Sequence, residues 1–199
     1  MNRMRTAVAA VLGLAVAIVC GAARGDLIGS FTAPAELHDL AHSQFITWGV
    51  DVGVEDPALV TAETATLVIE NIYNWRWEDS VLYVRLLDWA PLGVAYYQDN
   101  QGGGNNFQGQ GVGLVTYHDL PGPGHPVTLT YVFSDAEVAA LNGYIHNDGR
   151  FALGFDPDCH FYNDDITLHV GGVVVPEPGS VVFVGLGLAG MVWRMGRRR

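Results

Sequence analysis

The residues best suited to chemistry lie in one acidic segment, GFDPDCHFYNDDITL, at residues 154–168. Within ten residues it supplies side-chain oxygens of the kind that bind hard cations: Asp156, Asp158, Asn163, Asp164 and Asp165. Calcium takes about six to eight such oxygens in a flexible geometry. The segment is not an EF-hand, because Phe161 stands where the sixth position needs glycine. Two interpretations stay open: a calcium site, calcium being the one cofactor suggested, or a turn whose carboxylates accept backbone N–H bonds.

A second candidate is the aromatic pair in NIYNWRWED. On a strand, Trp75 and Trp77 would share one face, with Arg76 on the opposite face. Exposed tryptophans can stack on sugar rings, and Glu78 or Asp79 could bond sugar hydroxyls. The alternative is that both tryptophans cover an end of the core or a strand edge. The pair therefore predicts either a carbohydrate-binding surface or a packing role.

Sequence patterns typical of catalysis are weak. There is no G-x-S-x-G, and Cys159 and His160 are neighbours whose side chains would point apart on an extended chain. His38 and His42 lie four residues apart but lack the glutamate of H-E-x-x-H. A hydrolase would need two carboxylates that converge in space, which spacing along the chain does not reveal. We therefore expect a protein that is not an enzyme.

The elements that must position these residues are short strands. Apolar residues alternate with polar or small ones, as in Leu82, Val84 and Leu86, and a period of two is typical of half-buried strands. Short strands with turn-rich connections predict an all-β fold, an antiparallel β-sandwich of the jelly-roll or Greek-key type. About nine strands are expected, at 27–32, 46–52, 65–73, 82–86, 92–98, 111–118, 127–133, 150–155 and 166–170.

One short helix is expected among the late strands. Ser134 as N-cap with Glu137 at N3 is a capping box, in which each side chain satisfies a backbone N–H of the first turn. Gly143 and the turn at 147–149 bound the helix, and the pattern allows a second short helix over 34–43. Residues 99–113 are rich in Gly, Asn and Gln, so they predict a long loop that contributes nothing to the core.

The charge of the chain is divided sharply between its ends and its middle. Residues 26–175 hold three arginines and no lysine against twenty acidic residues, which gives a formal charge of −17. Such a surface repels nucleic acid and anionic lipid, because both need a cationic patch on their partner. It suits an extracellular space with divalent cations or high salt, or it simply keeps the domain soluble.

Both ends of the chain look like targeting segments. A basic start, an apolar run over 6–23 and the small residues Ala23 and Gly25 predict a signal peptide, residues 1–25, that is cleaved before Asp26; an uncleaved anchor is the alternative. The acidic sandwich would span 26–170 and a linker 171–175. At the other end, residues 178–195 would make a helix of about 27 Å against a bilayer core of roughly 30 Å. By the positive-inside rule, the arginines at its far end stay cytoplasmic: Arg194, Arg197, Arg198 and Arg199.

The order Val175-Pro176-Glu177-Pro178-Gly179, apolar helix, arginine cluster resembles the PEP-CTERM sorting domain of Gram-negative and related bacteria. The resemblance covers about residues 175–199. It implies a transmembrane sorting signal at 176–199, in which Pro176, Glu177 and Pro178 are recognised by an exosortase, a membrane cysteine transpeptidase. Proteins with this tail are secreted and often associated with exopolysaccharide and biofilm matrix. Leu82–Leu86, Asp99–Gly104 and residues 154–164 are also similar to domains often found ahead of such tails, which have no settled activity.

Together these features predict an exported, acidic, non-catalytic β-sandwich. It would pass through an inner-membrane intermediate and then reach the cell surface or the extracellular matrix. Its expected partners are the exosortase, the membrane before processing, and polysaccharide, with no nucleic acid. A carbohydrate-binding module is the first alternative, and a jelly-roll hydrolase is the second.

Overall fold

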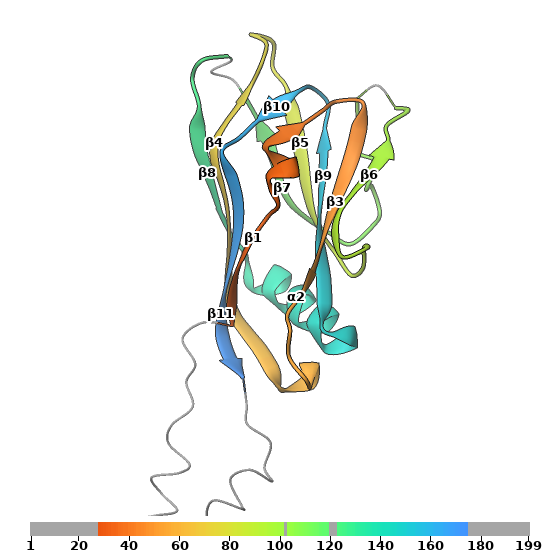
Figure 1. Ribbon diagram of the computed structural model, residues 1–199, viewed down its shortest axis with the longest axis vertical. Helices are drawn as coiled ribbons and strands as arrows, with labels where there is room; N and C mark the ends of the chain where they lie inside the picture. Colours follow the sequence, from red (N-terminus) through yellow and green to blue (C-terminus); the bar gives the residue numbers. More distant parts are fainter. Residues whose placement is uncertain (1–27, 102, 120–122, 175–199) are drawn as a thin grey trace, which may run out of the picture. The chain divides into compact units, whose positions relative to one another are not determined.

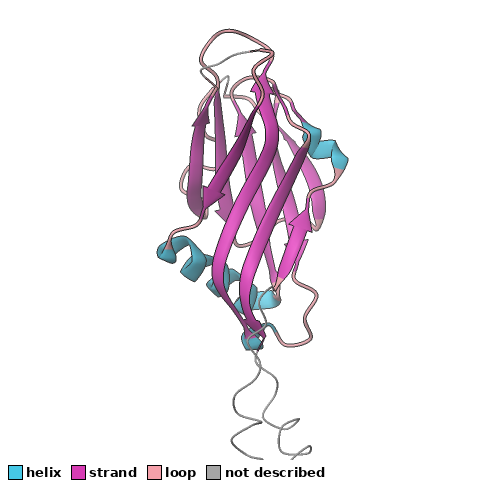
Figure 2. Cartoon of the chain, turned by 90° about the vertical axis from the view of Figure 1, so that its left-hand side faces the viewer, coloured by secondary structure: helices cyan, strands magenta, loops and turns pink. Residues whose placement is uncertain are grey.

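The computed structural model describes residues 28–101, 103–119 and 123–174, and these form two antiparallel β-sheets (Figure 1). The two sheets face each other with the core between them, so the predicted all-β sandwich is confirmed (Figure 2). Within the described ranges, no helix has the length and apolar character needed to cross a membrane. The predicted signal peptide and C-terminal span lie outside these ranges.

The first sheet has six strands in the order β1-β11-β4-β10-β2, with β8 also paired to β4. Its members are β1 (Gly29–Thr32), β2 (Asp39–Leu40), β4 (Val60–Asn74), β8 (Val127–Val132), β10 (Phe161–Tyr162) and β11 (Asp165–Val174). The second sheet has the order β6-β3-β9-β5-β7. It consists of β3 (Gln44–Asp51), β5 (Val81–Leu87), β6 (Gly93–Gln98), β7 (Val112–His118) and β9 (Arg150–Pro157). All nine predicted strands are present, and β2 and β10 are too short to leave a periodic signal in the sequence.

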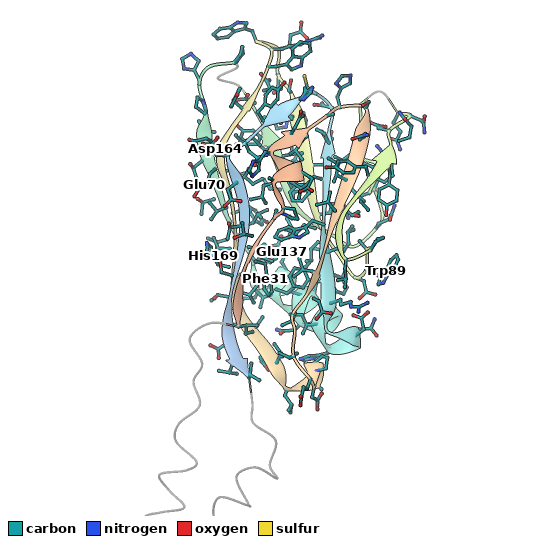
Figure 3. The ribbon with its side chains drawn as sticks, viewed as in Figure 1. Phe31, Glu70, Trp89, Glu137, Asp164 and His169 are labelled. Carbon is teal, nitrogen blue, oxygen red and sulfur yellow. The ribbon has the colours of Figure 1, made fainter. Side chains whose placement is uncertain are left out.

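The core lies between the inner faces of the sheets, as the alternation predicted. Leu82, Val84 and Leu86 of β5 are buried, and Phe31 of β1 meets Phe151 of β9 edge to face with ring centroids 5.7 Å apart. Figure 3 shows Phe31 between the sheets, whereas Glu70 and His169 lie on the outer side of the six-stranded sheet. Side chains of β5 and β11 therefore alternate between the buried inner face and the more exposed outer face, as a period of two predicts.

The last strand is longer than predicted. β11 continues through Val174, so residues 171–174 belong to the sheet and not to a linker. Gly172 makes this pairing possible, because a Cβ at this position would lie 2.1 Å from the carbonyl oxygen of Thr61 on β4. Gly172 therefore marks a close approach of two backbones, which the sequence alone does not distinguish from a flexible connection.

The predicted helix is confirmed at its start and ends within the predicted turn at 147–149, but Gly143 does not bound it. α2 (Asp135–Asp148) begins with the capping box of Ser134 and Glu137 and runs past Gly143 to a left-handed cap at Gly149, where φ is +80°. Gly143 does not end the helix because it faces solvent, while buried residues follow on the other face. The segment predicted as a second helix forms only the 3-10 turn η1 (Ala35–His38), and another 3-10 turn, η2 (Pro57–Leu59), precedes β4.

The glycine-rich loop between β6 and β7 corrects a further expectation. Phe107 lies at its centre and is 2 % exposed, packed on Gly154 of β9 in a small cluster with Leu87, Ala90 and Ala152. A Cβ at position 154 would come within 2.9 Å of the Phe107 ring, so the glycine provides the room for it. The loop therefore covers part of the outer face of the five-stranded sheet.

The sandwich has two distinct ends, which we call the helix end and the rim end. At the helix end lie α2, η2 and the last residues of β11 (Figure 1). At the rim end lie β10 and the turn that joins β4 to β5, residues 75–80 (Figure 1). The pairing of Tyr162 with Tyr73 and the contact of Gly172 with Thr61 place the two ends at opposite ends of β4.

Candidate functional site

The rim end carries the most exposed aromatic side chains that the sequence singled out. Trp75 is 48 % exposed and Trp77 is 73 % exposed, and both lie in the turn after β4. The prediction that they share one face of a strand is therefore wrong, and neither indole is buried in the core, which was one part of the alternative that they cover an end of the core or a strand edge. Both indoles instead project from the turn into solvent.

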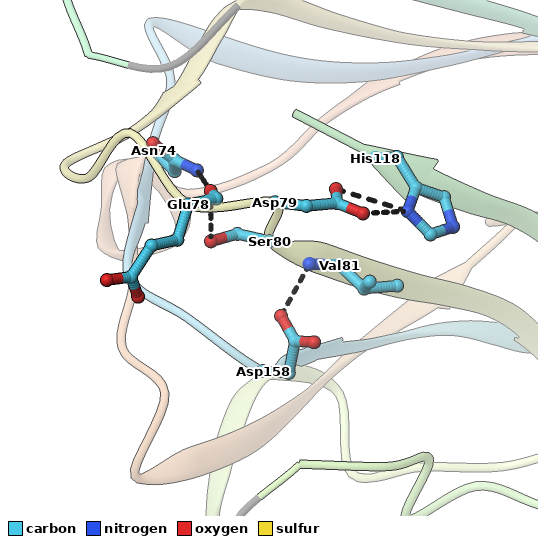
Figure 4. A network of polar contacts seen from close by, with 7 residues as sticks. All are labelled: Asn74, Glu78, Asp79, Ser80, Val81, His118 and Asp158. Carbon is cyan, nitrogen blue, oxygen red and sulfur yellow. Dashed lines mark hydrogen bonds and ion pairs between the residues drawn. The ribbon is translucent and has the colours of Figure 1, made fainter. Parts of the chain in front are cut away.

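A buried clamp at the base of the turn explains this conformation. The Asn74 side chain accepts a bond from Arg76 N at 3.0 Å. It also donates one to the carbonyl oxygen of Glu78 at 3.1 Å (Figure 4). The Asn74 N–H donates to the Asp119 carboxylate at 2.6 Å, and Asp119 N donates to the carbonyl oxygen of Ser80 at 3.0 Å. Asn74 and Asp119 are almost fully buried. The base of the turn is thus held by buried polar groups, while both indoles remain largely exposed.

Two further acids fix the start of β5. Asp79 approaches His118 Nδ1 at 3.2 Å across the end of β7, and the Asp158 carboxylate accepts a bond from Val81 N (Figure 4). Burial raises the pKa of Asp158, and the bond from Val81 opposes that shift. Both carboxylates therefore serve to join neighbouring elements at the rim end.

The exposed rings belong to two neighbouring groups of contacts at the rim end, which together we call the aromatic rim. The Arg76 guanidinium lies 4.5 Å above the Trp75 ring, and His160 meets the edge of the same indole with centroids 6.3 Å apart. His160 stacks on Tyr162 at 4.8 Å and bonds the Asp39 carboxylate. The rim consists of Tyr73, Trp75, Arg76, Trp77, His125, His160 and Tyr162, with His125 6.0 Å from the Trp77 ring. Flat exposed indoles flanked by hydrogen-bonding groups can stack on sugar rings.

The five predicted calcium ligands do not form one site. Each has its own partner: Asp156 with Asn106, Asp158 with Val81 N, Asn163 with Leu37 O, Asp164 with Asn71, and Asp165 with Ile166 N. Among the residues that the structure describes, no three His, Cys, Asp or Glu side chains gather as metal ligands. The acids of this segment accept separate bonds from backbone and amide groups of different elements.

The sequence did not reveal the residues that hold the rim together. Asn74 and Asp119 are 45 residues apart, and His125 and His160 meet the tryptophans from separate loops. An isolated Asn at the end of a strand was the only local signal, since this residue favours turns. His38 and His42, the pair weighed as zinc ligands, form no metal cluster with the other described residues.

The C-terminal segment is identified by comparison. Residues 174–199 match the family model of the PEP-CTERM protein-sorting motif, so the chain carries this motif, as its residues predicted. The motif implies export and exosortase-dependent sorting to the cell surface through a membrane-anchored intermediate. The Pro-Glu-Pro residues and the arginine cluster fall within the match and outside the described residues.

Two solved structures have a remote likeness to the chain. Latent aurone synthase, a polyphenol oxidase, has a TM-score of 0.38 and 10 % identity over 73 % of this chain. The CBM22-1–GH10 modules of Clostridium thermocellum xylanase 10B, complexed with xylohexaose, have a TM-score of 0.30 and 8 % identity over 77 % of this chain. The chain spans 28 % of either protein. Similarity at this level defines no shared activity. No curated protein matches the chain.

Proposed function

We propose that this chain is a non-catalytic protein of the cell surface or extracellular matrix that binds polysaccharide through its aromatic rim. One observation carries the proposal: Trp75 and Trp77 are exposed at the end of the sandwich opposite the end of β11, where the sorting motif begins. From Thr61 to Asn74, β4 spans roughly 40 Å at about 3.3 Å per residue. The rim is therefore displaced by the length of the sandwich from the point where the sorting tail joins it.

The chemistry of the rim favours sugars. An indole presents a flat apolar face to the C–H groups of a pyranose ring, and nearby imidazole and carboxylate groups can bond its hydroxyls. Acids beneath the rim are already engaged, since Asp119 accepts from Asn74 N and Asp158 accepts from Val81 N. Because these two carboxylates hold the fold together, they support a binding role for the rim and not a hydrolytic one.

The sorting tail supplies the location. An exosortase would recognise Pro176, Glu177 and Pro178 on the outer side of the inner membrane, while the arginine cluster at 194–199 stays cytoplasmic. Mass spectrometry of the protein from its native envelope tests this step. A C-terminus near Pro178 supports processing, and an intact Arg199 contradicts it. Changing all three motif residues to alanine should leave the protein in the inner membrane with its tail attached.

Binding is tested by substituting the tryptophans. The full chain with Trp75→Ala and Trp77→Ala should lose binding to a polysaccharide array by about tenfold or more, since each stacked ring contributes on the order of 1 kcal/mol or more. Trp89→Ala is the matched control, because Trp89 is 63 % exposed on the β5–β6 turn, away from the rim (Figure 3). Equal binding by the double variant and the wild type would refute the proposal.

A further inference from the structure

A polar hollow of about 190 Å³ lies over β5 and β7, on the outer face of the five-stranded sheet. Its lining includes Tyr83, Arg85, Asn105, Gly113 and Thr116, and no acidic residue. Tyr83 stands opposite Thr116, and Arg85 stands opposite Gly113, in the pairing of β5 with β7. Tyr83 and Arg85 point away from the core because they alternate with the buried residues Leu82, Val84 and Leu86 of β5, and Gly113 and Thr116 are exposed positions of β7.

The guanidinium of Arg85 is held in a fixed position. Its Nε donates to the carbonyl oxygen of Gln110 at 2.7 Å, and its Nη2 donates to that of Gly111 at 3.2 Å. The Nη1 nitrogen is the guanidinium atom closest to Gly113, where a Cβ would lie 3.6 Å away. Because residue 113 is a glycine, no side chain covers Nη1 on the side of the hollow.

Arg85 also differs from the other cations of this acidic domain. Arg76 pairs with Glu78 at 3.9 Å and Arg150 pairs with Asp51 at 3.4 Å. Within 28–101, 103–119 and 123–174, no carboxylate lies within ion-pair distance of Arg85. A guanidinium that is oriented by two carbonyl groups and has no acidic partner is suited to bind an anion from outside the chain.

The wall of the hollow is preformed. Asn106, next to Asn105, donates from its backbone N–H and its side-chain amide to the Asp156 carboxylate. Phe107 anchors the same loop against Phe45, with ring centroids 5.3 Å apart. The loop is thus tied to β9 and β3, and a ligand would not have to order it.

We propose that this hollow binds one sugar residue that carries a carboxylate, a uronate unit. The carboxylate bonds Arg85 Nη1, and Tyr83, Asn105 and Thr116 lie where they can bond the ring hydroxyls. The volume of about 190 Å³ is smaller than the roughly 300–1,000 Å³ of pockets for drug-sized ligands, so it suits a single sugar ring. The nearest acid on the neighbouring strand is Asp156, opposite Tyr83, and its carboxylate already accepts bonds from Asn106. The hollow shares no residue with the aromatic rim, so this inference does not rest on the proposed function.

The first test is titration of the full chain with glucuronate by calorimetry. Saturable binding is expected. Glucose and acetate should each bind at least about tenfold more weakly, because glucose lacks the carboxylate and acetate lacks the sugar ring. Binding of glucose as tight as that of glucuronate would show that the Arg85 guanidinium does not recognise the carboxylate. Equal binding of acetate would show that the hollow takes a bare anion and no sugar. Either result, or no binding of glucuronate, overturns the proposal.

A glycine pair supplies the matched variants. Gly113→Ala places a methyl group beside Arg85 Nη1 at an ordinary contact distance, so the fold should tolerate it. We expect about tenfold weaker glucuronate binding with an unchanged melting temperature. Gly143→Ala is the control, because a Cβ there meets nothing within 4 Å, and this variant should bind as the wild type does. Unchanged binding by Gly113→Ala would also overturn the assignment.

Discussion

The two ends of the sandwich are closed by different means. At the helix end, Leu141 and Ile145 of α2 are fully buried in the core, and the Asn142 side chain bonds both the N–H and the C=O of Ala62. At the rim end, buried polar groups hold the base of the turn over 75–80, and its indoles are exposed to solvent. The helix end thus uses its side chains for packing, whereas the rim end leaves them available to a ligand.

The largest expected effect on the free energy of unfolding comes from a substitution at the helix end. Leu141→Ala deletes a fully buried side chain and should lower the free energy of unfolding by about 2–5 kcal/mol, from lost apolar burial and the cavity left behind. Chemical unfolding of the full chain, followed by tryptophan fluorescence, measures it. A loss below about 1 kcal/mol would mean that α2 is not part of the core.

The second prediction concerns the polar contact at the same end. Asn142→Ala leaves the Ala62 N–H and C=O without their side-chain partner and should cost about 1–3 kcal/mol. Asn147→Ala is the control on the same helix, because Asn147 is exposed, and its effect should stay within about 0.5 kcal/mol. Equal effects of the two substitutions on unfolding would contradict the assigned role of Asn142.

At the rim end, the same measurement should give a much smaller change. Trp75→Ala combined with Trp77→Ala should alter the free energy of unfolding by about 1 kcal/mol or less, since exposed side chains contribute little to stability. The variant should nevertheless lose polysaccharide binding. A destabilisation as large as that of Leu141→Ala would show that the indoles pack, and the contrast between the two ends would disappear.

The smallest effect is on the pH dependence of stability near the rim end. Burial raises the pKa of Asp158 above its ordinary value of 3.8. Its contribution to stability is therefore fully present below pH 3.8 and is lost as the pH rises through the folded-state pKa. Asp158→Asn keeps an oxygen acceptor for Val81 N and removes the titration, so the melting temperature should decline less over that interval. A steeper decline in the variant would contradict the sign.

The parts of the molecule that follow local rules were predictable. Alternation located the strands because the sandwich buries one face of each sheet, and the Ser134–Glu137 capping box marked the start of α2. The turn at 147–149 marked the end of α2, but its continuation through Gly143 was not predictable, since only the tertiary structure shows that Gly143 faces solvent. The rim clamp joins Asn74 to Asp119 across 45 residues, and Asp156 finds its partner Asn106 50 residues away. Such pairs leave no spacing pattern, so the acids at 156–165 suggested calcium instead.

The central claim is that the tail determines where the protein goes and the rim determines whether it stays. The most direct measurement is the fraction of exported protein retained in the matrix after washing, for the wild type, the Trp75→Ala/Trp77→Ala variant and the Trp89→Ala control. We predict that all three are processed near Pro178, and that only the double variant is released into the medium. Retention of the double variant at the wild-type level would contradict the account.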